Sequence, residues 1–205
     1  MTMKNVYTLT YNAPVLDRAE ILRYAGVRTD APEIQKLLEE CIAEAEERFT
    51  YKVCYAEFPI KREGELLDIG FTSTPSASLG KNLRGCESIL LFAATVGLEI
   101  DRLIARYSSI SPTKSLLFSA LGAERIESLC NSFCKDIEEK NRAEGRSVRP
   151  RFSAGYGDFP IEEQLKIFAV LDCPRKIGVS LNGSLLMSPS KSVTAIIGIS
   201  PKINN

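Results

Sequence analysis

The stretch Ser88-Ile89-Leu90-Leu91-Phe92-Ala93-Ala94-Thr95-Val96 is an almost unbroken apolar run, bounded by Gly85 and Gly97. It is far shorter than the roughly 20 residues that a membrane-spanning helix needs. Short apolar runs between glycines are typical of strands that are buried on both faces of a sheet. The run therefore predicts a central strand with other elements packed against each of its faces.

Two helices are predicted after this strand. One lies at about 98–107, and a longer one begins at Ser111-Pro112 and reaches about Glu144, where Gly145 ends it. The apolar residues of the longer helix recur with helical periodicity, which places them on one face. They are Leu117, Ala120, Leu121, Ile126, Leu129, Cys130, Phe133 and Ile137. We expect this face to pack against the core.

Helices are also predicted before the strand. Residues 15–24 form a short one that Gly26 stops. Asp30-Ala31-Pro32-Glu33 then supplies a capping residue, an early proline and an acid, which is the usual opening of a helix. The apolar face that follows predicts a helix that ends at about Arg48.

The remaining elements are short. Segments 51–60 and 65–71 are rich in β-favouring residues on either side of Arg62-Glu63-Gly64, which predicts a hairpin. Four further elements are a helix from Thr74-Pro75-Ser76 to near Gly85, a helix at about 161–171, and strands at 176–187 and 192–199. No linker divides the 205 residues. The chain is therefore predicted to form one α+β domain over 1–205, with a separate N-terminal helical lobe as the alternative.

The composition excludes several classes of function. Lysine plus arginine equals aspartate plus glutamate at 26 each, so no net charge attracts a nucleic acid. No apolar run is long enough to span a membrane, and the start of the chain has no signal-peptide core. We expect a cytoplasmic protein that contacts neither nucleic acid nor membrane.

The chain contains no histidine. This absence excludes Ser-His-Asp and Cys-His catalytic units, histidine-ligated zinc and imidazole acid–base chemistry. Any catalytic effect must come from binding and positioning, so we predict no catalytic side chain.

The six cysteines form no C-x-x-C pair; they are Cys41, Cys54, Cys86, Cys130, Cys134 and Cys173. Reduced, buried cysteines are favoured over a disulfide framework. A thiolate metal site is the alternative, but the sequence does not group its ligands. We therefore predict no metal site.

Residues 145–160 form a long loop, and long loops in compact domains are often functional. Within it stands Arg151-Phe152-Ser153-Ala154-Gly155-Tyr156-Gly157-Asp158-Phe159-Pro160. Its R-x-x-x-G-Y pattern resembles the S-adenosylmethionine-binding signature of the reactivation domain of cobalamin-dependent methionine synthase. The block looks especially like members of this family that stand alone.

The flanking segments also resemble that family. Downstream, the similar segments are Ile177-Gly178 leading into Val179-Ser180-Leu181, then Met187-Ser188-Pro189 and Ser192-Val193-Thr194. Upstream, Phe92 to Asp101 is similar to the strand-to-helix junction before the family's long helix. The resemblance covers about 88–200, whereas 1–85 match only weakly. It implies the activation-domain fold, with a twisted, largely antiparallel sheet and several helices.

The resemblance implies a binding site for S-adenosylmethionine. The residues that it assigns to this ligand are Arg151, Ala154, Gly155, Tyr156 and Glu127. A guanidinium can bind the ligand's carboxylate through two hydrogen bonds. Glycines permit close approach of the backbone, and a tyrosine offers a flat face and a hydroxyl. A carboxylate favours the positive sulfonium.

Several site assignments have alternatives. Further candidates for contacts to the ligand or a corrinoid are Gly157, Asp158, Lys191 and Ser192. Glu124 rivals Glu127 as the acid on the long helix. The structural alternative for Asp158 is a cap on the following helix, and the alternative for Lys191 is a place on the surface. In the simplest structural interpretation, the glycines only shape a turn and Arg151 is exposed.

The function that the resemblance implies is reductive reactivation of a cobalamin enzyme. S-adenosylmethionine would methylate the cobalt of a corrinoid that a separate protein carries, either the cobalamin-binding module of methionine synthase or another corrinoid protein. A flavodoxin or ferredoxin type of electron donor would supply the electron. The chain would then be a component of a methyltransferase system rather than a complete enzyme.

Two other functions compete with this one. The first is a corrinoid-protein docking or assembly factor that does not use S-adenosylmethionine, and the intact R-x-x-x-G-Y pattern argues against it. The second is an ordinary S-adenosylmethionine methyltransferase. Such enzymes usually have a glycine-rich loop between the first strand and helix of a parallel sheet, and the sequence shows no such opening.

Overall fold

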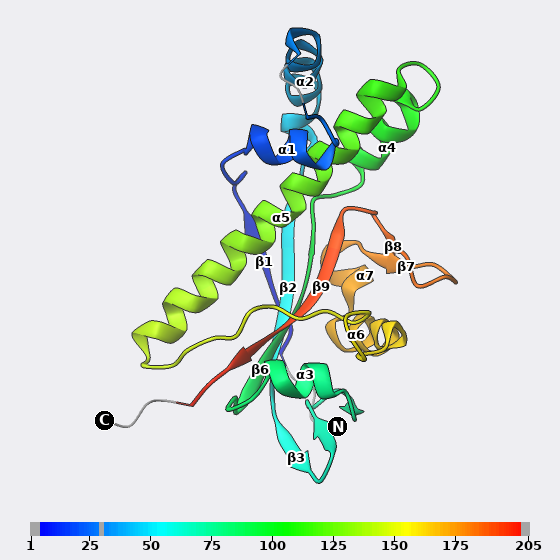
Figure 1. Ribbon diagram of the computed structural model, residues 1–205. Helices are drawn as coiled ribbons and strands as arrows, with labels where there is room; N and C mark the ends of the chain where they lie inside the picture. Colours follow the sequence, from blue (N-terminus) through cyan, green and yellow to red (C-terminus); the bar gives the residue numbers. More distant parts are fainter. Residues whose placement is uncertain (1–4, 29–30, 202–205) are drawn as a thin grey trace.

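A four-stranded antiparallel sheet lies at the centre of the computed structural model, which describes residues 5–28 and 31–201. Its strands are β1 (Tyr7–Tyr11), β2 (Tyr51–Pro59), β6 (Ser88–Thr95) and β9 (Ser192–Ile199), in the order β1-β2-β6-β9. Every residue of β6 is buried, which confirms the predicted central strand. The strands turn relative to one another across the sheet (Figure 1).

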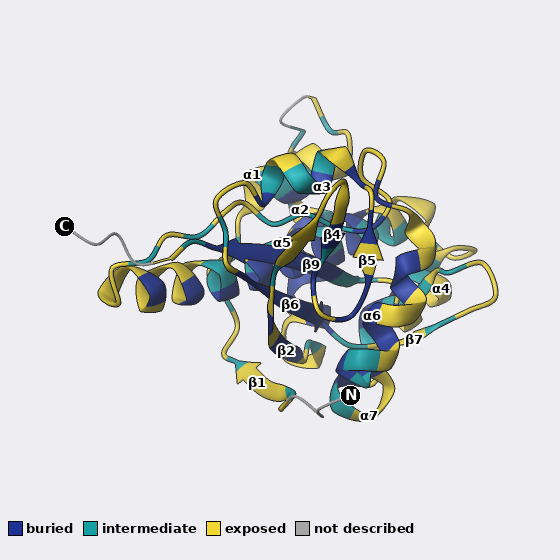
Figure 2. Ribbon diagram, turned by 90° about the horizontal axis from the view of Figure 1, so that it is seen from below, coloured by how far each residue is buried: buried dark blue, intermediate teal, exposed yellow. Residues whose placement is uncertain are grey.

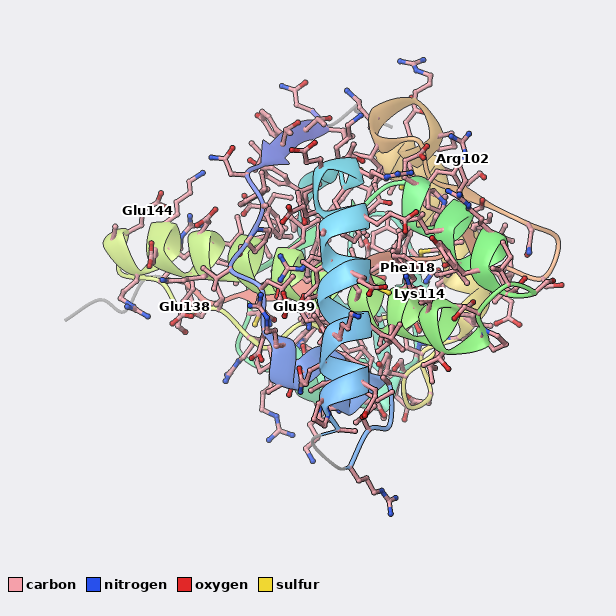
Figure 3. The ribbon with its side chains drawn as sticks, turned by 90° about the horizontal axis from the view of Figure 1, so that it is seen from above. Glu39, Arg102, Lys114, Phe118, Glu138 and Glu144 are labelled. Carbon is pink, nitrogen blue, oxygen red and sulfur yellow. The ribbon has the colours of Figure 1, made fainter. Side chains whose placement is uncertain are left out.

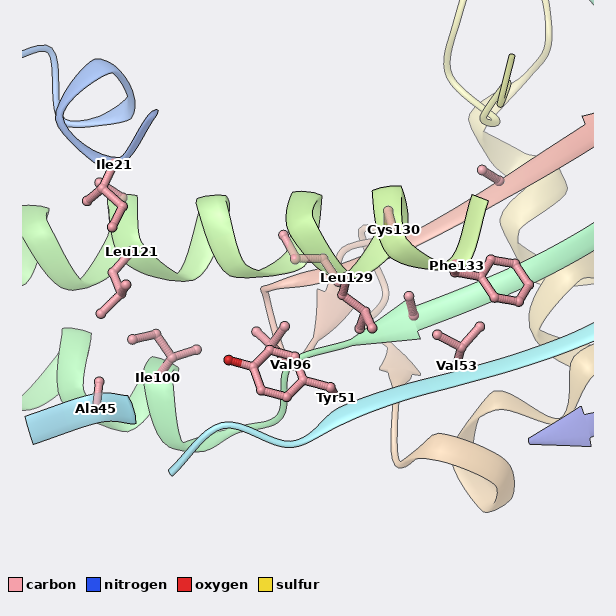
Figure 4. Packing of buried hydrophobic residues seen from close by; sticks show 14 of the residues in the cluster. Ile21, Ala45, Tyr51, Val53, Val96, Ile100, Leu121, Leu129, Cys130 and Phe133 are labelled. Carbon is pink, nitrogen blue, oxygen red and sulfur yellow. The ribbon is translucent and has the colours of Figure 1, made fainter. Parts of the chain in front are cut away.

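The long helix α5 (Pro112–Ala143) crosses one face of the sheet (Figure 1). Three shorter helices complete this layer: α1 (Arg18–Tyr24), α2 (Pro32–Ala45), which continues into the 3-10 turn η1 (Glu46–Arg48), and α4 (Glu99–Tyr107). Phe133 of α5 packs on Phe92 of β6 with ring centroids 4.8 Å apart. Figure 4 shows Phe133, Leu129 and Leu121 pointing from α5 into this core.

A second core lies on the other face. Its covering elements are α3 (Ala77–Asn82), the 3-10 turn η2 (Ile161–Glu163), α6 (Gln164–Leu171) and α7 (Cys173–Ile177), with the small sheet of β3 (Lys61–Glu63), β4 (Leu66–Asp68) and β5 (Ser73–Thr74). Along β6, Ile89, Leu91 and Ala93 belong to this core, whereas Leu90, Phe92 and Ala94 belong to the core beneath α5. This alternation explains why the run in β6 is apolar throughout.

The outer surfaces of the helices carry the charges. Figure 3 shows Glu39 on α2, Arg102 on α4 and Glu138 on α5 pointing away from the core. Several pair with neighbours, as in the ion pair of Glu39 with Arg18 at 2.7 Å. Such exposed pairs contribute little to stability, so packing on the sheet holds the helices in place.

A buried ion pair joins the start of the chain to α5. Glu124 and Arg125 are each 2% exposed, and the guanidinium donates to the carbonyls of Pro14 and Val15 at 2.6 and 2.9 Å. The Glu124 carboxylate accepts from the backbone of Asp17 at 3.2 Å. The pair therefore fixes the segment that leads from β1 into α1.

Three sequence expectations about elements were wrong or incomplete. Segment 176–187 is not a strand: α7 ends at Ile177, Gly178 has a φ of 74°, and a small hairpin of β7 (Ser180–Leu181) and β8 (Met187–Ser188) follows. The hairpin around Gly64 joins only β3 to β4, because β2 pairs with β1 and β6 instead. The strand β1 was not predicted.

Other expectations concern helix starts, cysteines and membranes. The predicted cap Asp30 lies outside the described residues, and Ala31 stands at the helix start without a side-chain cap. All six cysteines are free, and four are buried, as expected. Within 5–28 and 31–201 no cluster of metal-ligating side chains occurs, and no helix there is both long and apolar enough to traverse a bilayer.

Candidate functional site

The loop 145–160 is tied to the edge of the central sheet. The Arg149 backbone donates to the Gly198 carbonyl at 2.8 Å, and Phe152 and Ile196 exchange backbone hydrogen bonds of 2.9 and 2.8 Å. The Ser153 hydroxyl donates to the Thr194 carbonyl at 2.7 Å. The first half of the loop is thus an irregular extra strand beside β9, and this fixes the direction of the side chains that follow.

A tight turn follows at 153–159. The backbone of Tyr156 donates to the Ser153 carbonyl at 3.2 Å, and that of Gly155 to the Phe159 carbonyl at 2.8 Å. Gly155 has a φ of 92°, a conformation that other residues rarely adopt. The turn leaves Tyr156 67% exposed at the rim of the site.

Gly157 and Asp158 hold this turn against α3. A Cβ at Gly157 would lie 2.5 Å from the Ser78 hydroxyl oxygen, so only glycine permits this approach. The Asp158 carboxylate accepts from the Ser76 hydroxyl at 2.5 Å and from the backbones of Ala77 and Ser78 at 2.8 and 3.0 Å. These hydrogen bonds, the one from Ser76 foremost, hold the pKa of Asp158 well below its usual range. The sequence suggested that Asp158 caps the helix that follows it. The structure shows that it caps α3 instead, and both of its carboxylate oxygens accept hydrogen bonds there.

Arg151 points toward α5. Its guanidinium forms an ion pair with Glu127 and donates to the Asn131 side chain at 3.5 Å. The side chains of Arg151 and Glu127 are 27% and 39% exposed, so the pair lies between core and solvent. The second terminal nitrogen of Arg151, Nη1, is buried and has no hydrogen-bond partner among the described residues. Buried donors are nearly always hydrogen-bonded in folded proteins, so this nitrogen indicates a place for a ligand acceptor.

A cavity of about 450 Å³ opens beside this pair. The loop supplies Arg151, Phe152, Ser153, Ala154 and Tyr156; α5 supplies Glu127; η2, α6 and β8 supply Ile161, Gln164 and Met187; and β9 supplies Ser192, Val193 and Thr194. One end of the cavity is therefore charged and the rest is largely apolar or neutral.

Most of the predicted site residues meet here. Arg151, Ala154, Tyr156, Glu127 and Ser192 line the cavity, and Gly155 forms the turn between two of them. Lys191 does not: its amine donates to the Ser119 hydroxyl at 3.1 Å, and burial lowers its pKa. A larger cavity of about 850 Å³, lined by Phe58, Val170 and Lys176 among others, contains none of the predicted residues.

The geometry distinguishes the two candidate acids of α5. Glu124 is buried in its contacts with Arg125, Ser128 and the segment near Asp17, whereas Glu127 faces the cavity. Cys130 is buried on the same helix as Glu127, and burial raises the pKa of its thiol to about 12. This shift disfavours the thiolate form of Cys130, and the residue is not part of the cavity lining.

Sequence reasoning missed part of the lining. Gln164 accepts a hydrogen bond from the Thr194 hydroxyl at 2.9 Å, and both residues are buried. Met187, Phe152 and Ile161 supply apolar surface. Met187 and Thr194 belong to segments that resemble the family. No sequence pattern indicated Gln164, because a glutamine in a helix is usually a surface residue without a ligand.

No protein-family model matches the chain, and no curated protein matches it. Among solved structures, it is similar to a crystal structure of the MetH reactivation domain bound to AdoHcy, with a TM-score of 0.68 at 16% sequence identity. The similarity covers 100% of this chain and 81% of that one, so it includes 1–85, which the sequence matched only weakly. The α+β fold of the methionine synthase activation domain, with a largely antiparallel sheet, is thereby confirmed.

Proposed function

We propose that this chain binds S-adenosylmethionine in the cavity beside Arg151 and supports reductive methylation of cob(II)alamin on a separate corrinoid protein. The observation that carries the proposal is the Arg151–Glu127 pair in the wall of that cavity, with one buried guanidinium nitrogen left without a partner. The fold of a domain that has been crystallised with AdoHcy supports it.

The charged end of the cavity fits the amino-acid part of the ligand. S-adenosylmethionine carries a carboxylate, an ammonium and a sulfonium. The free Nη1 of Arg151 would donate to the carboxylate, and Glu127 would lie near the positive groups. Arg151 and Glu127 already pair without a ligand, so their side chains would lose little conformational entropy on binding. Arg151 would then also contact the ligand's carboxylate, and Glu127 its positive groups.

The rest of the cavity fits the nucleoside. Its volume of about 450 Å³ lies within the range of roughly 300–1,000 Å³ that is usual for small-molecule sites. The ring centroids of Phe152 and Tyr156 lie 6.3 Å apart, and Met187 also lines the cavity. Such surfaces suit a flat base, while backbone groups near Ala154 would read its polar edge.

The bound ligand would supply the chemistry, because its sulfonium methyl group would pass to cobalt(I) on the partner protein and a neutral thioether would remain. The chain's own residues would hold the methyl donor in place, and this contribution is proximity and orientation. It requires no proton transfer, in keeping with a chain that lacks histidine. The role is that of a component in a methyltransferase system.

The surroundings of the cavity suit a large partner. Tyr156, Ile161 and Leu186 are 67%, 42% and 64% exposed, and the first two line the cavity itself. Exposed apolar groups that gather near a site mark docking surfaces. We propose that the cobalamin-binding module of methionine synthase, or another corrinoid protein, docks here, and that a flavodoxin or ferredoxin supplies the electron.

Calorimetric titration tests the ligand. We expect saturable binding of S-adenosylmethionine by the wild type and a loss of roughly tenfold to a hundredfold in affinity for Arg151→Ala, because a hydrogen bond to a charged group contributes about 1.5–3 kcal/mol. Arg149→Ala is the matched control, since Arg149 lies on the same segment but donates to the Arg84 carbonyl, outside the cavity lining. Absence of wild-type binding contradicts the proposal.

Visible spectroscopy of cobalt tests the reaction. A corrinoid partner held as cob(II)alamin is mixed with reductant, S-adenosylmethionine and this chain, and we expect methylcobalamin to accumulate. Arg151→Ala should slow its formation, and Arg149→Ala should not. Docking on the corrinoid protein without any dependence on S-adenosylmethionine would instead support an assembly factor.

A further inference from the structure

The two edges of the central sheet differ. Beside β9, the segment 147–152 forms backbone hydrogen bonds and covers the edge. Beside β1, the described residues form no backbone hydrogen bond to Tyr7–Tyr11 other than those of β2. Four of the five residues of β1 are exposed, and Figure 2 shows the strand at the margin of the molecule. Within residues 5–28 and 31–201, the β1 edge therefore has backbone donors and acceptors that no other backbone group uses.

The exposed strand also lacks the features that usually protect an edge. Its sequence is Tyr7-Thr8-Leu9-Thr10-Tyr11, without charge, proline or glycine. Natural edges commonly carry lysine, proline or a bulge, because bare edges pair with other chains. A run of β-favouring residues on an unprotected edge strand indicates that β1 pairs with a strand of another chain.

The strand reads the same in both directions. If two copies pair antiparallel about a two-fold axis at Leu9, Leu9 faces itself, Thr8 faces Thr10, and Tyr7 faces Tyr11 of the second copy. Antiparallel aromatic pairs and threonine pairs each contribute roughly 0.2–1 kcal/mol. In a strand, alternate residues direct their backbone N–H and C=O groups to the same side. The outward groups of β1 belong either to residues 7, 9 and 11 or to residues 8 and 10, and both sets are symmetric about Leu9.

The tyrosines are already held in place for such pairing. Tyr7 stacks on Tyr55 of β2 with centroids 5.4 Å apart, and the Tyr11 hydroxyl donates to Asp136 of α5 at 2.7 Å. Side chains that are ordered before association lose little entropy when they pair.

We infer that two copies of this chain associate through β1, in antiparallel register about Leu9, so that their central sheets become continuous. The contact is self-complementary and closed, as a two-fold dimer requires. The sheet order places β1 at the edge opposite β9, so the cavities beside Arg151 remain open at the two far ends. A strand of five residues gives a small interface, so we expect a weak dimer whose population depends on protein concentration.

Sedimentation equilibrium over a range of concentrations tests the association. We expect the wild type to pass from monomer to dimer and Thr8→Lys/Thr10→Lys to remain monomeric, because its lysines would face each other across the pairing. Ser109→Lys/Ser184→Lys is the matched control, with the same added charge at exposed positions away from β1. A wild type that stays monomeric, or a dimer that the strand lysines leave intact, overturns the inference. Circular dichroism verifies that each variant is folded.

Disulfide trapping tests the register. Facing residues of antiparallel strands have Cα atoms about 4.5–5.5 Å apart, within the range of a disulfide. With oxidised glutathione as the oxidant, Leu9→Cys should form a covalent dimer, whereas Thr8→Cys should not exceed the wild type, because it faces Thr10 rather than itself. The wild type, with its own six cysteines, sets the background. Equal trapping of both variants, or trapping of neither, overturns the two-fold register.

Discussion

At the scale of single residues, Glu127 has two roles that a substitution can separate. It holds Arg151 through an ion pair, and it faces the cavity in which a sulfonium is proposed to bind. Glu127→Gln keeps the shape but removes the charge. We expect affinity for S-adenosylmethionine to fall about tenfold, and affinity for the neutral thioether S-adenosylhomocysteine to fall less. Competitive calorimetry measures both ligands.

The control for this variant lies on the same helix. Glu138→Gln changes an exposed acid that pairs with Arg142, outside the cavity lining, and should leave both affinities unchanged. An equal loss for the two ligands in Glu127→Gln would mean that Glu127 does not act on the sulfonium, and that it acts on the ammonium, which both ligands carry, or by positioning Arg151.

Asp158 gives a pH-dependent prediction. Its pKa is lowered in the folded protein, chiefly by the hydrogen bond from Ser76, so its contribution to stability is present above the unfolded value near 3.9 and declines as the pH falls below it. Asp158→Ala should therefore lower the melting temperature at pH 7 and lower it less at pH 3. Thermal denaturation of both proteins at the two pH values measures this. A difference that does not change with pH would contradict the role of the charge.

At the scale of elements, local patterns were sufficient for the helices and for the central strand. The periodic stripe and the Ser111-Pro112 start predicted α5 nearly to its ends, because helix periodicity and caps are local. The prediction for segment 176–187 failed because α7 continues to Ile177 and because hydrogen bonds around Asn182 turn the rest into the β7–β8 hairpin. The strand β1 was missed because it is short and mostly exposed, so no buried stripe marks it.

The candidate site also contains residues that a local motif predicts and residues that only the packing of distant segments brings to the cavity. Arg151, Ala154 and Tyr156 belong to one loop, so one motif could indicate all three, and these residues do meet at one cavity. Gln164 and Ile161 reach the cavity only because α6 and η2 pack beneath the loop, which no local pattern reveals. Asp158 stood inside the motif, yet its partners on α3 precede it by about 80 residues of sequence.

The buried pair on α5 gives a prediction for an element. Arg125 satisfies Glu124 and two carbonyls of the segment before α1. Arg125→Met should destabilise the protein by about 3–5 kcal/mol, because it leaves Glu124 charged and buried without its partner. Urea denaturation measures the loss. Arg102→Met, at an exposed ion pair on α4, should change stability by less than about 1 kcal/mol.

At the scale of the whole molecule, the central sheet is the shared wall of two cores. Leu91 belongs to the core under α6 and α7, and its neighbour Phe92 belongs to the core under α5. Neither core can lose the sheet without exposing the other. We therefore expect both to unfold in one transition, although they contact different helices.

The buried thiols on the two sides make this expectation measurable. Cys130 lies in the core under α5 and Cys173 in the core under α6 and α7, and both are fully buried. In pulsed thiol labelling across a urea series, the two should become reactive at the same midpoint. Leu91→Ala should lower both midpoints equally, by the equivalent of about 2–5 kcal/mol, because the cavity it creates weakens the common sheet. Leu116→Ala, at a half-exposed position of α5, should move neither by more than about 0.5 kcal/mol. Separate midpoints, or a shift of Cys173 alone, would show that the two faces unfold independently and that the sheet does not couple them.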